Sequence, residues 1–307
     1  MDVLADLLDR SRARGGAFGR TVLAKPWGVR FDLRLPLAVH AVIGGEARVV
    51  GGTDEARLLP GDIALVRGPE PSTLDSCGRP RRLDLGEALT RFATTSRALV
   101  FPGLPSGELV CGAYTFDGDL CRPLLDSLPP IVHLRAGTDT APLRPLIAGL
   151  ADEVADENPG QQVVLDRYLD LLLVQALRSH FARRDANVPG WYRGLRDEPV
   201  SAALRAIHER PAEPWTVEML AATAQLSRAA FARRFAEVVG QAPQTYVTGW
   251  RMQLAKDRLR DPTASLAAVA AEVGYANAYA FAAAFKREVG EPPGRWRTRL
   301  DQSPSAA

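Results

Sequence analysis

Few side chains in this sequence could perform metal or catalytic chemistry. Its four histidines are His40, His133, His180 and His208, and no two of them have the spacing of a ligand pair. A catalytic metal usually takes three protein ligands, so we expect no bound metal. The sequence also contains no nucleophile elbow, no phosphate-binding glycine loop and no paired carboxylates. We therefore expect no cofactor and no enzymatic activity.

Three cysteines are too few for a disulfide framework, but they could carry redox chemistry. Cys111 lies in an apolar run, where a cysteine usually packs as an inert hydrophobic residue. Cys77 and Cys121 lie in loop-like stretches close to arginines, and a positive neighbour favours the reactive thiolate. Together with His40, the three cysteines are our candidate sensor residues. Both the inert and the redox interpretation stay open.

Arginine dominates the basic residues of the chain. Of 38 basic side chains only Lys25, Lys256 and Lys286 are lysines, and the formal net charge is +2. Residues 200–301 contain 14 basic and 10 acidic side chains. A planar guanidinium can bind phosphates and the edge of guanine. This mildly basic C-terminal third is compatible with nucleic-acid binding but does not establish it.

The strongest pattern in the chain is an internal repeat. Residues 220–243 align with residues 270–293 at an offset of 50 and without a gap. The identical pairs include Ala221/Ala271, Phe231/Phe281, Phe235/Phe285, Val239/Val289, Gly240/Gly290 and Pro243/Pro293. This run of matches predicts a duplicated structural unit.

Each copy has the pattern of a helix-turn-helix. Thr216 and Ser265 are placed to cap the first helix of each copy. Gly274 falls in the second turn, where a positive φ suits glycine, whereas Ala224 takes the aligned place in the first. Ala224 therefore predicts some strain or a different turn.

The second helix of each copy, expected over 227–240 and 277–290, presents small and basic residues on its outward face. An arginine there can bridge O6 and N7 of guanine, and alanine can touch a thymine methyl group. The candidate DNA-binding residues are Ser227, Arg228, Ala229, Ala232, Arg233, Asn277, Tyr279, Ala282, Ala283, Lys286 and Arg287.

Composition and periodicity indicate an α+β protein of about two domains. Its 307 residues are 46% hydrophobic, enough for sizeable cores. Residues 20–116 are short β-rich runs separated by turns, which favour a β-barrel or sandwich, and the pattern is helical from about residue 140. The sequence has no membrane-spanning apolar run and no signal-peptide pattern, so we expect a cytoplasmic protein.

The C-terminal third resembles the AraC/XylS family of transcription regulators. The resemblance rests on Trp215-Thr216, Leu226-Ser227-Arg228, Phe231-Ala232-Arg233-Arg234-Phe235, Pro243-Gln244-Thr245-Tyr246, Arg251-Met252, Val273-Gly274-Tyr275, Phe285-Lys286 and Pro293-Gly294-Arg295-Trp296. It implies two helix-turn-helix units on a linking helix at about 244–260, with recognition helices in successive major grooves. Ala282 and Ala283 stand where many members have polar residues, so Lys286 and Arg287 are expected to hold phosphates.

The first 135 residues resemble the cupin domain that often precedes this DNA-binding module. The resemblance rests on Pro26-Trp27, Val39-His40-Ala41-Val42, Pro60-Gly61-Asp62, Cys111-Gly112-Ala113-Tyr114 and Pro123-Leu124-Leu125-Asp126. Metal-binding cupins use an HxH…E cluster and a later histidine; His40 and Glu46 keep two of these places, but Val42 replaces the second histidine. A cupin-type metalloenzyme fused to a DNA-binding domain is the alternative function, and a non-specific architectural DNA binder is a third.

The expected organisation is a β-barrel, cupin-like sensor domain over 1–136, a helical dimerisation segment over 137–184, a linker over 185–199 and a double helix-turn-helix domain over 200–302. The candidate dimer contact is the stripe of Leu165, Tyr168, Leu169 and Leu172, although such a stripe more often packs within its own domain. We expect a sequence-specific transcription activator controlled by a small molecule or an oxidant. The expected partners are double-stranded promoter DNA, RNA polymerase, a small-molecule effector and a second copy of the chain.

Overall fold

The chain folds into two compact units, which are described separately. The computed structural model describes residues 2–11, 14–32, 34–76, 83–95, 98–137, 139–155 and 158–302. Residues 13–116 and 124–187 form one unit, called the β unit. Residues 1–12, 117–123 and 188–307 form the other, called the helical unit. The α+β class predicted from the sequence is confirmed.

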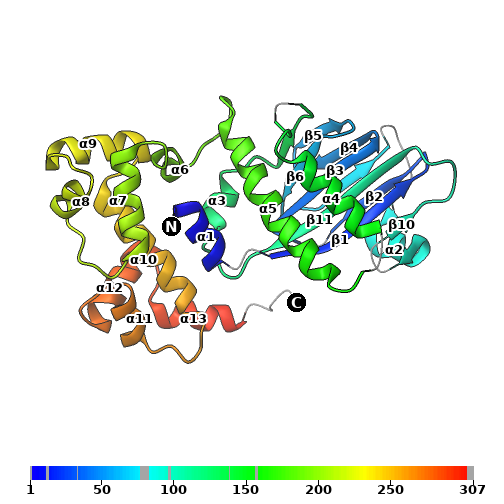
Figure 1. Ribbon diagram of the computed structural model, residues 1–307. Coiled ribbons are helices and arrows are strands. Elements are labelled where there is room, and N and C mark those ends of the chain that lie inside the picture. The colour runs from blue at the N-terminus through cyan, green and yellow to red at the C-terminus, as the bar shows by residue number, and fades with distance from the viewer. Residues whose placement is uncertain are drawn as a thin grey trace. The chain divides into compact units, whose positions relative to one another are not determined.

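Short strands build the β unit into two sheets (Figure 1). The described strands are β1 (Arg14–Leu23), β2 (Gly28–Phe31), β3 (Leu37–Gly45), β4 (Ala47–Gly51), β5 (Asp54–Leu58), β6 (Ile63–Arg67), β7 (Ser72–Asp75), β8 (Leu83–Asp84), β9 (Ala93–Thr95), β10 (Ala98–Val100), β11 (Gly107–Thr115) and β12 (Ile131–Leu134). One sheet has the order β12-β6-β3-β11-β1-β10-β9, and the other has the order β5-β4-β7-β2-β8. Most neighbouring strands are antiparallel, which suits the short turns between them.

An apolar core holds the two sheets together. Val42 and Leu109 come from the first sheet, Val49 and Leu74 come from the second, and all four are buried in one cluster with Trp27. Burial of every second residue along β4 is the alternation expected of a strand with one face in a core. Packing of these inward side chains fixes the register of both sheets.

Helices cover part of the first sheet. The β unit contains α2 (Leu85–Phe92), most of α3 (Arg122–Asp126), α4 (Arg144–Ala155) and α5 (Gln161–Ala182). The long helix α5 lies across β1 and β11 in Figure 1, beside α4. The hydroxyl of Tyr114, on β11, donates a 3.1 Å hydrogen bond to the carbonyl of Leu169. This hydrogen bond is buried and ties α5 to β11.

The predicted dimer contact on α5 is wrong, because its leucines face the core of the β unit. Leu165, Leu169 and Leu172 are at most 2% exposed, and Tyr168 is half-buried. These residues follow the 3.6-residue period of a helix that packs on a sheet. A stripe of apolar residues in the sequence does not show whether that helix face packs within the chain or against a second copy.

The remaining described helices form the helical unit. These are α1 (Val3–Arg10), α6 (Gly190–Gly194), α7 (Glu198–Glu209), α8 (Val217–Thr223), α9 (Arg228–Val239), α10 (Pro243–Arg258), α11 (Leu266–Glu272), α12 (Ala278–Val289) and α13 (Pro293–Gln302). In the part of the chain that the structure describes, no helix combines the length and the apolar character that a membrane crossing needs.

Two segments of the helical unit differ from the expected organisation. Residues 1–12 and 117–123 group with this unit, although the sequence places them in the sensor domain. The expected linker at 185–199 contains α6, which packs against the end of α9. A Cβ on Gly190 would lie 1.8 Å from the carbonyl oxygen of Val239, so only glycine permits this approach. The glycine at this position therefore reflects close packing.

Candidate nucleic-acid interface

The first helix-turn-helix is formed by α8 and α9, and side chains cap both helices. The hydroxyl of Thr216 accepts a 3.2 Å hydrogen bond from the amide of Met219 at the start of α8. Ser227 accepts a 3.3 Å bond from the amide of Ala230 at the start of α9. Gly240 ends α9 in a left-handed conformation with φ of 85°. These capping residues explain why the ends of the helices could be predicted from the sequence.

The second helix-turn-helix repeats this design with α11 and α12. Ser265 accepts from the amide of Ala268 at 3.1 Å, and the Asn277 side chain accepts from the amide of Ala280 at 2.8 Å. Gly290 ends α12 with φ of 91°. The duplicated motif is thus present in the structure at the predicted segments.

The gapless alignment of the two copies is wrong in their turns. In the first copy Gln225 has the positive φ, 54°, and in the second copy Gly274 has it, 77°. These two residues are 49 positions apart, whereas the caps Ser227 and Asn277 are 50 apart. The second copy therefore has one additional residue, Ala276, before its recognition helix.

Ala224, which the sequence compared with Gly274, has ordinary right-handed helical angles and no strain. The first helices α8 and α11 are both rich in alanine, so an alignment shifted by one residue still matches alanine with alanine. The turns differ in length, and that difference could not be recovered from composition alone.

Aromatic residues fix the inward face of each recognition helix. Phe231 and Phe235 on α9 are fully buried with ring centroids 5.5 Å apart, and Phe281 and Phe285 on α12 are fully buried at 5.6 Å. The rings occupy one side of each helix and leave the other side to solvent, where most of the candidate DNA-binding residues lie.

The outward face of α9 combines small side chains with arginine. The side chain of Arg233 is 73% exposed and approaches Glu237 only at 3.9 Å. Ala229 is exposed, and Ala232 is half-buried. Arg228 pairs with Glu218, but both side chains are mostly exposed, and such surface pairs contribute little stability. Arg228 and Arg233 are therefore available to a ligand on this face.

Arg234, the next residue, has a different role. Its Nε lies 2.9 Å from Oδ2 and 3.0 Å from Oδ1 of Asp197, and Asp197 also caps α7. This contact ties α9 to α7. The two adjacent arginines thus differ in exposure and in contacts, a difference that could not be predicted from the sequence.

The outward face of α12 is led by an aromatic residue. Tyr279 is 86% exposed, and Ala283 and Lys286 are exposed. Lys286 forms no ion pair with the described residues, whereas Arg287 lies 2.9 Å from Glu288. Ala282 is half-buried. The predicted residues of both recognition helices are thus exposed, apart from the half-buried Ala232 and Ala282.

Two further arginines stabilise the unit. Arg251 donates to the carbonyls of Pro211 and Glu213, and its guanidinium lies 5.9 Å from the centre of the Tyr275 ring. Arg297 donates to the carbonyls of Leu259 and Ala264. Arg251 belongs to the sequence motif that resembles the AraC/XylS family, and the contacts of both arginines are structural.

The candidate sensor residue His40 is buried on β3. It is 1% exposed, its ring centroid lies 5.2 Å from that of Phe31, and neither ring nitrogen has a hydrogen bond among the described residues. Burial lowers the pKa of His40 to about 4, so the ring is neutral at pH 7. Glu46 is bound by Lys25 and Arg57. No group of three His, Cys, Asp or Glu side chains within the described ranges is arranged to hold a metal.

The described cysteines lie in environments that suppress the thiolate. Burial raises the pKa of Cys111 to about 12 and that of Cys121 to about 11. Cys121 is 1% exposed, and its sulfur lies 3.0 Å from the Ser11 hydroxyl, so the expectation of a loop-like thiol activated by Arg122 is wrong. Cys77 lies outside the described residues.

Comparison with known families matches both halves of the chain. The family described as "Cupin" matches residues 2–182, and the family described as "Helix-turn-helix domain" matches residues 220–299. The first match covers more than half of the chain.

Several curated proteins are similar over nearly the whole length. A putative AraC-like transcription regulator from Streptomyces lividans is 36% identical over 97% of this chain and 98% of its own. The RCS-specific HTH-type transcriptional activator RclR from Escherichia coli is 31% identical over 98% of this chain and 99% of its own. The HTH-type transcriptional regulator AlkR from Acinetobacter baylyi is 27% identical over 97% and 99%. These relatives are transcription regulators and not enzymes.

Solved structures give partial likenesses. The DNA-binding domain of AdpA, in complex with a target DNA, is 29% identical and matches 36% of this chain and 99% of that chain with a TM-score of 0.34. ToxT from Vibrio cholerae O395 is 10% identical and matches 92% of this chain and 96% of that chain with a TM-score of 0.33.

Proposed function

Because the chain belongs to the AraC family of DNA-binding transcription regulators, we propose that α9 and α12 recognise a specific double-stranded promoter sequence. The observation that carries the proposal is the pair of capped recognition helices, each with its aromatic face buried and its small and basic face exposed. An α-helix with such a face fits the major groove of B-DNA.

On α9, Arg233 contacts a guanine and Arg228 assists at the start of the helix. Ala229 and Ala232 permit close approach to the base edges. Ser227 lies at the helix N-terminus, where backbone amides and the helix dipole favour a phosphate. This helix supplies most of the sequence preference.

On α12, Lys286 and Arg287 hold the phosphate backbone, and Tyr279 with Ala282 and Ala283 faces the groove. Asn277 starts the helix as Ser227 does in the first copy. Since alanine offers no hydrogen bond to a base, this helix contributes affinity more than specificity.

The β unit receives the signal, and the chain acts as an activator with RNA polymerase as a partner. We favour a small-molecule effector over an oxidant, because Cys111 is half-buried, Cys121 is buried, and both thiols have raised pKa values. For the oxidant alternative, Cys77 is the remaining candidate among the three cysteines.

A homodimer positions two DNA-binding halves on neighbouring sites. The leucine stripe of α5 is buried, so we assign the contact to the opposite face, where Val163, Val164 and Leu171 are 62%, 39% and 52% exposed. Replacing Val164 and Leu171 together by Asp should convert the dimer to a monomer in sedimentation velocity. The matched control replaces Leu59 and Leu104, which are 50% and 90% exposed outside α5, by Asp in the same way. A wild-type chain that is monomeric at micromolar concentration would contradict the assignment.

The proposed function is tested by selecting sites from a random duplex library with the full chain. A preferred sequence should emerge and should also occur in the promoter region next to the gene. Binding to the selected site should exceed binding to random duplex by about 10³-fold or more at physiological salt. Equal affinity for both would identify a non-specific architectural binder instead.

A further inference from the structure

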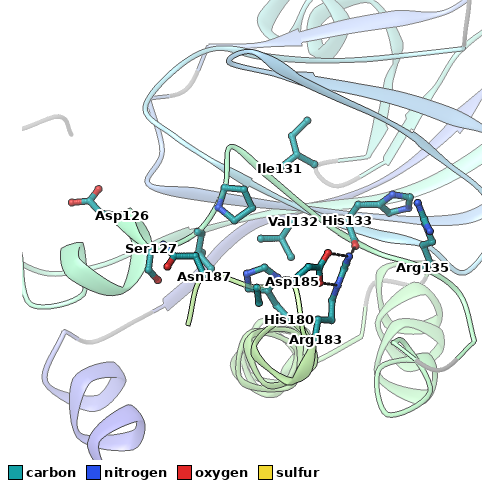
Figure 2. Close-up of a pocket in the computed structure, with 13 residues that line it drawn as sticks. Asp126, Ser127, Ile131, Val132, His133, Arg135, His180, Arg183, Asp185 and Asn187 are labelled. Atoms are coloured by element: carbon teal, nitrogen blue, oxygen red, sulfur yellow. Dashed lines mark hydrogen bonds and ion pairs between the residues drawn. The ribbon is translucent and has the colours of Figure 1, made fainter. Parts of the chain in front are cut away.

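Tyr279, on the recognition helix α12, is exposed and has no partner within the chain. Figure 2 shows the opposite situation in the β unit, at the pocket between β12 and the end of α5. There Arg183 lies 3.0 Å from Asp185, and the ring nitrogens of His180 are enclosed. Tyr279 is instead 86% exposed and forms no hydrogen bond or ring contact with the described residues. Its whole ring is therefore accessible to another molecule.

The position of Tyr279 is at the N-terminal end of α12. Asn277 caps this helix, and Tyr279 is its second residue. In a helix-turn-helix, the N-terminal residues of the recognition helix contact the edges of the bases. A side chain at this position is therefore expected to meet bases.

The fold of the repeat does not require an aromatic residue here. Ala229 is the second residue of α9 and takes the same place in the first copy. Both helices are anchored by buried phenylalanines on their other side. An exposed ring keeps apolar area in contact with water, so covering it with a bound molecule is favourable.

The neighbours of Tyr279 on the outward face are small and apolar. Ala283 lies one helical turn further along and is exposed, and Ala280 is also exposed. Lys286 follows at the next turn of the same face. In the part of this face that lies nearest the start of α12, the tyrosine hydroxyl is thus the one side-chain group of Tyr279, Ala280 and Ala283 that can form a hydrogen bond.

Thymine is the base that suits such an apolar face. In the major groove its C5-methyl group is apolar, whereas the edges of the other bases present hydrogen-bond donors and acceptors. Alanine and phenylalanine side chains are suited to contact with this methyl group. We propose that Tyr279 is a specificity-determining residue that recognises a thymine of the promoter site by contact of its ring with the C5-methyl group. Ala283 permits the close approach of the helix.

This inference rests on the proposed function, because it assigns a base preference to the recognition helix α12. Burial of one methyl-sized group changes an affinity by about fourfold. A bidentate arginine discriminates between bases more strongly than that. The helix α9, with Arg233, therefore still supplies most of the sequence preference, and α12 adds a smaller preference that needs no hydrogen bond.

The test uses the full chain and the site selected from the random library. Each thymine is replaced in turn by deoxyuridine, which lacks only the C5-methyl group, and affinity is measured by fluorescence anisotropy. At one thymine the replacement should weaken binding about fourfold. Tyr279→Ala should bind the thymine and deoxyuridine forms of that position equally, whereas Tyr279→Phe should keep the difference. Leu104→Ala, which removes a 90% exposed apolar side chain of the β unit, is the matched control and should behave as wild type.

A second measurement adds the methyl group to a different base. Cytosine in place of the same thymine should weaken binding, and 5-methylcytosine should recover about fourfold in wild type and in Tyr279→Phe. Tyr279→Ala should bind the cytosine and 5-methylcytosine sites equally. This pair of sites differs only in the methyl group, so it isolates the contact from the hydrogen bonds of the base pair.

Equal affinity for thymine and deoxyuridine at every position would overturn the inference. A difference that persists at every such thymine in Tyr279→Ala would overturn it as well. If Tyr279→Phe bound as weakly as Tyr279→Ala, the hydroxyl would be the contacting group, and the assignment of the ring would be wrong. A chain that selects no preferred site contradicts the proposed function itself, whereas a chain that selects a site without methyl discrimination through Tyr279 contradicts this inference alone.

Discussion

The carboxylate of Asp6 lies 2.8 Å from Nδ1 of His208, although 202 positions separate the two residues. On the other side of the ring, Nε2 of His208 lies 2.8 Å from the Tyr246 hydroxyl. A carboxylate only accepts, so Nδ1 carries the proton and the tyrosine donates to Nε2. The ring also stacks on Trp250 at 4.0 Å between centroids. Helix α1, the first in the chain, is thus built into the helical unit.

Replacing Asp6 by Asn should destabilise the helical unit. The side chains of Asp6 and His208 are only 4% and 2% exposed, so the lost charge-assisted hydrogen bond is not replaced by water. We expect the free energy of unfolding to fall by about 1–3 kcal/mol, measured by urea denaturation. Asp9→Asn, on the exposed face of the same helix, is the control and should change it by less than about 0.5 kcal/mol. Equal effects of both substitutions would contradict this role.

Acid should destabilise the same unit. Burial lowers the pKa of His208 and outweighs the opposing effect of Asp6. Burial raises the pKa of Asp6, but hydrogen bonds from His208 and Arg10 outweigh it and leave that pKa lowered. Groups with lowered pKa values bind fewer protons folded than unfolded, so stability rises with pH. Stability should therefore fall as pH drops below about 6.5, the ordinary pKa of histidine.

Tryptophan fluorescence during urea unfolding at pH 5 to 8 measures this dependence, because Trp191, Trp215, Trp250 and Trp296 belong to the helical unit. His208→Gln should flatten the dependence between pH 5 and 6.5. His133→Gln, in the β unit, is the control. An unchanged slope in His208→Gln would show that this pair does not set the pH response.

The two turns should respond oppositely to substitution. A Cβ on Gly274 would lie 2.4 Å from the carbonyl oxygen of Ala212, and its φ is 77°. Gly274→Ala should therefore cost about 1–3 kcal/mol. Gln225→Gly should be neutral or stabilising, because its φ of 54° suits glycine. Gly249→Ala in α10, where the Cβ has open space, is the control and should stabilise by about 0.4–1 kcal/mol. A tolerated Gly274→Ala would contradict the turn assignment.

Local signals made much of this fold predictable. The caps Ser227 and Asn277 and the buried phenylalanines specify the recognition helices from within a dozen residues, and the structure has them at the predicted segments. The Asp6–His208 contact leaves no such signal, because it depends on packing between distant segments. Cys121 was misinterpreted for the same reason: its environment is Ser11 and Leu7, not its neighbour Arg122.

The two described cysteines should be chemically unreactive. With pKa values raised to about 12 and about 11, Cys111 and Cys121 are thiols at pH 8, and the thiolate is the reactive form. In a Cys77→Ser variant both should react with Ellman's reagent at least about 100-fold more slowly than free cysteine. Unfolding in urea should release two fast thiols, which controls for the count. A fast thiol in the native variant would revive a redox role for one of them.

Substitutions on the two recognition helices should affect DNA binding in different ways. Arg233 is exposed on α9 and is proposed to contact a guanine, whereas Lys286 on α12 is proposed to hold a phosphate. Arg233→Ala should cost about 1–3 kcal/mol at the selected site and relax the preference at one base position. Lys286→Ala should weaken all sequences alike and reduce the slope of log affinity against log salt by about 1.

Fluorescence anisotropy of the full chain on the selected site and on single-base variants, at several salt concentrations, separates these outcomes. Arg30→Ala on β2 is the control for lost surface charge and should change neither quantity. Loss of a base contact weakens binding to some sequences only. Loss of a phosphate contact weakens binding to all of them, because phosphates carry no sequence information. If Arg233→Ala and Lys286→Ala gave the same profile across the site variants, the division between a specificity helix and an affinity helix would be wrong.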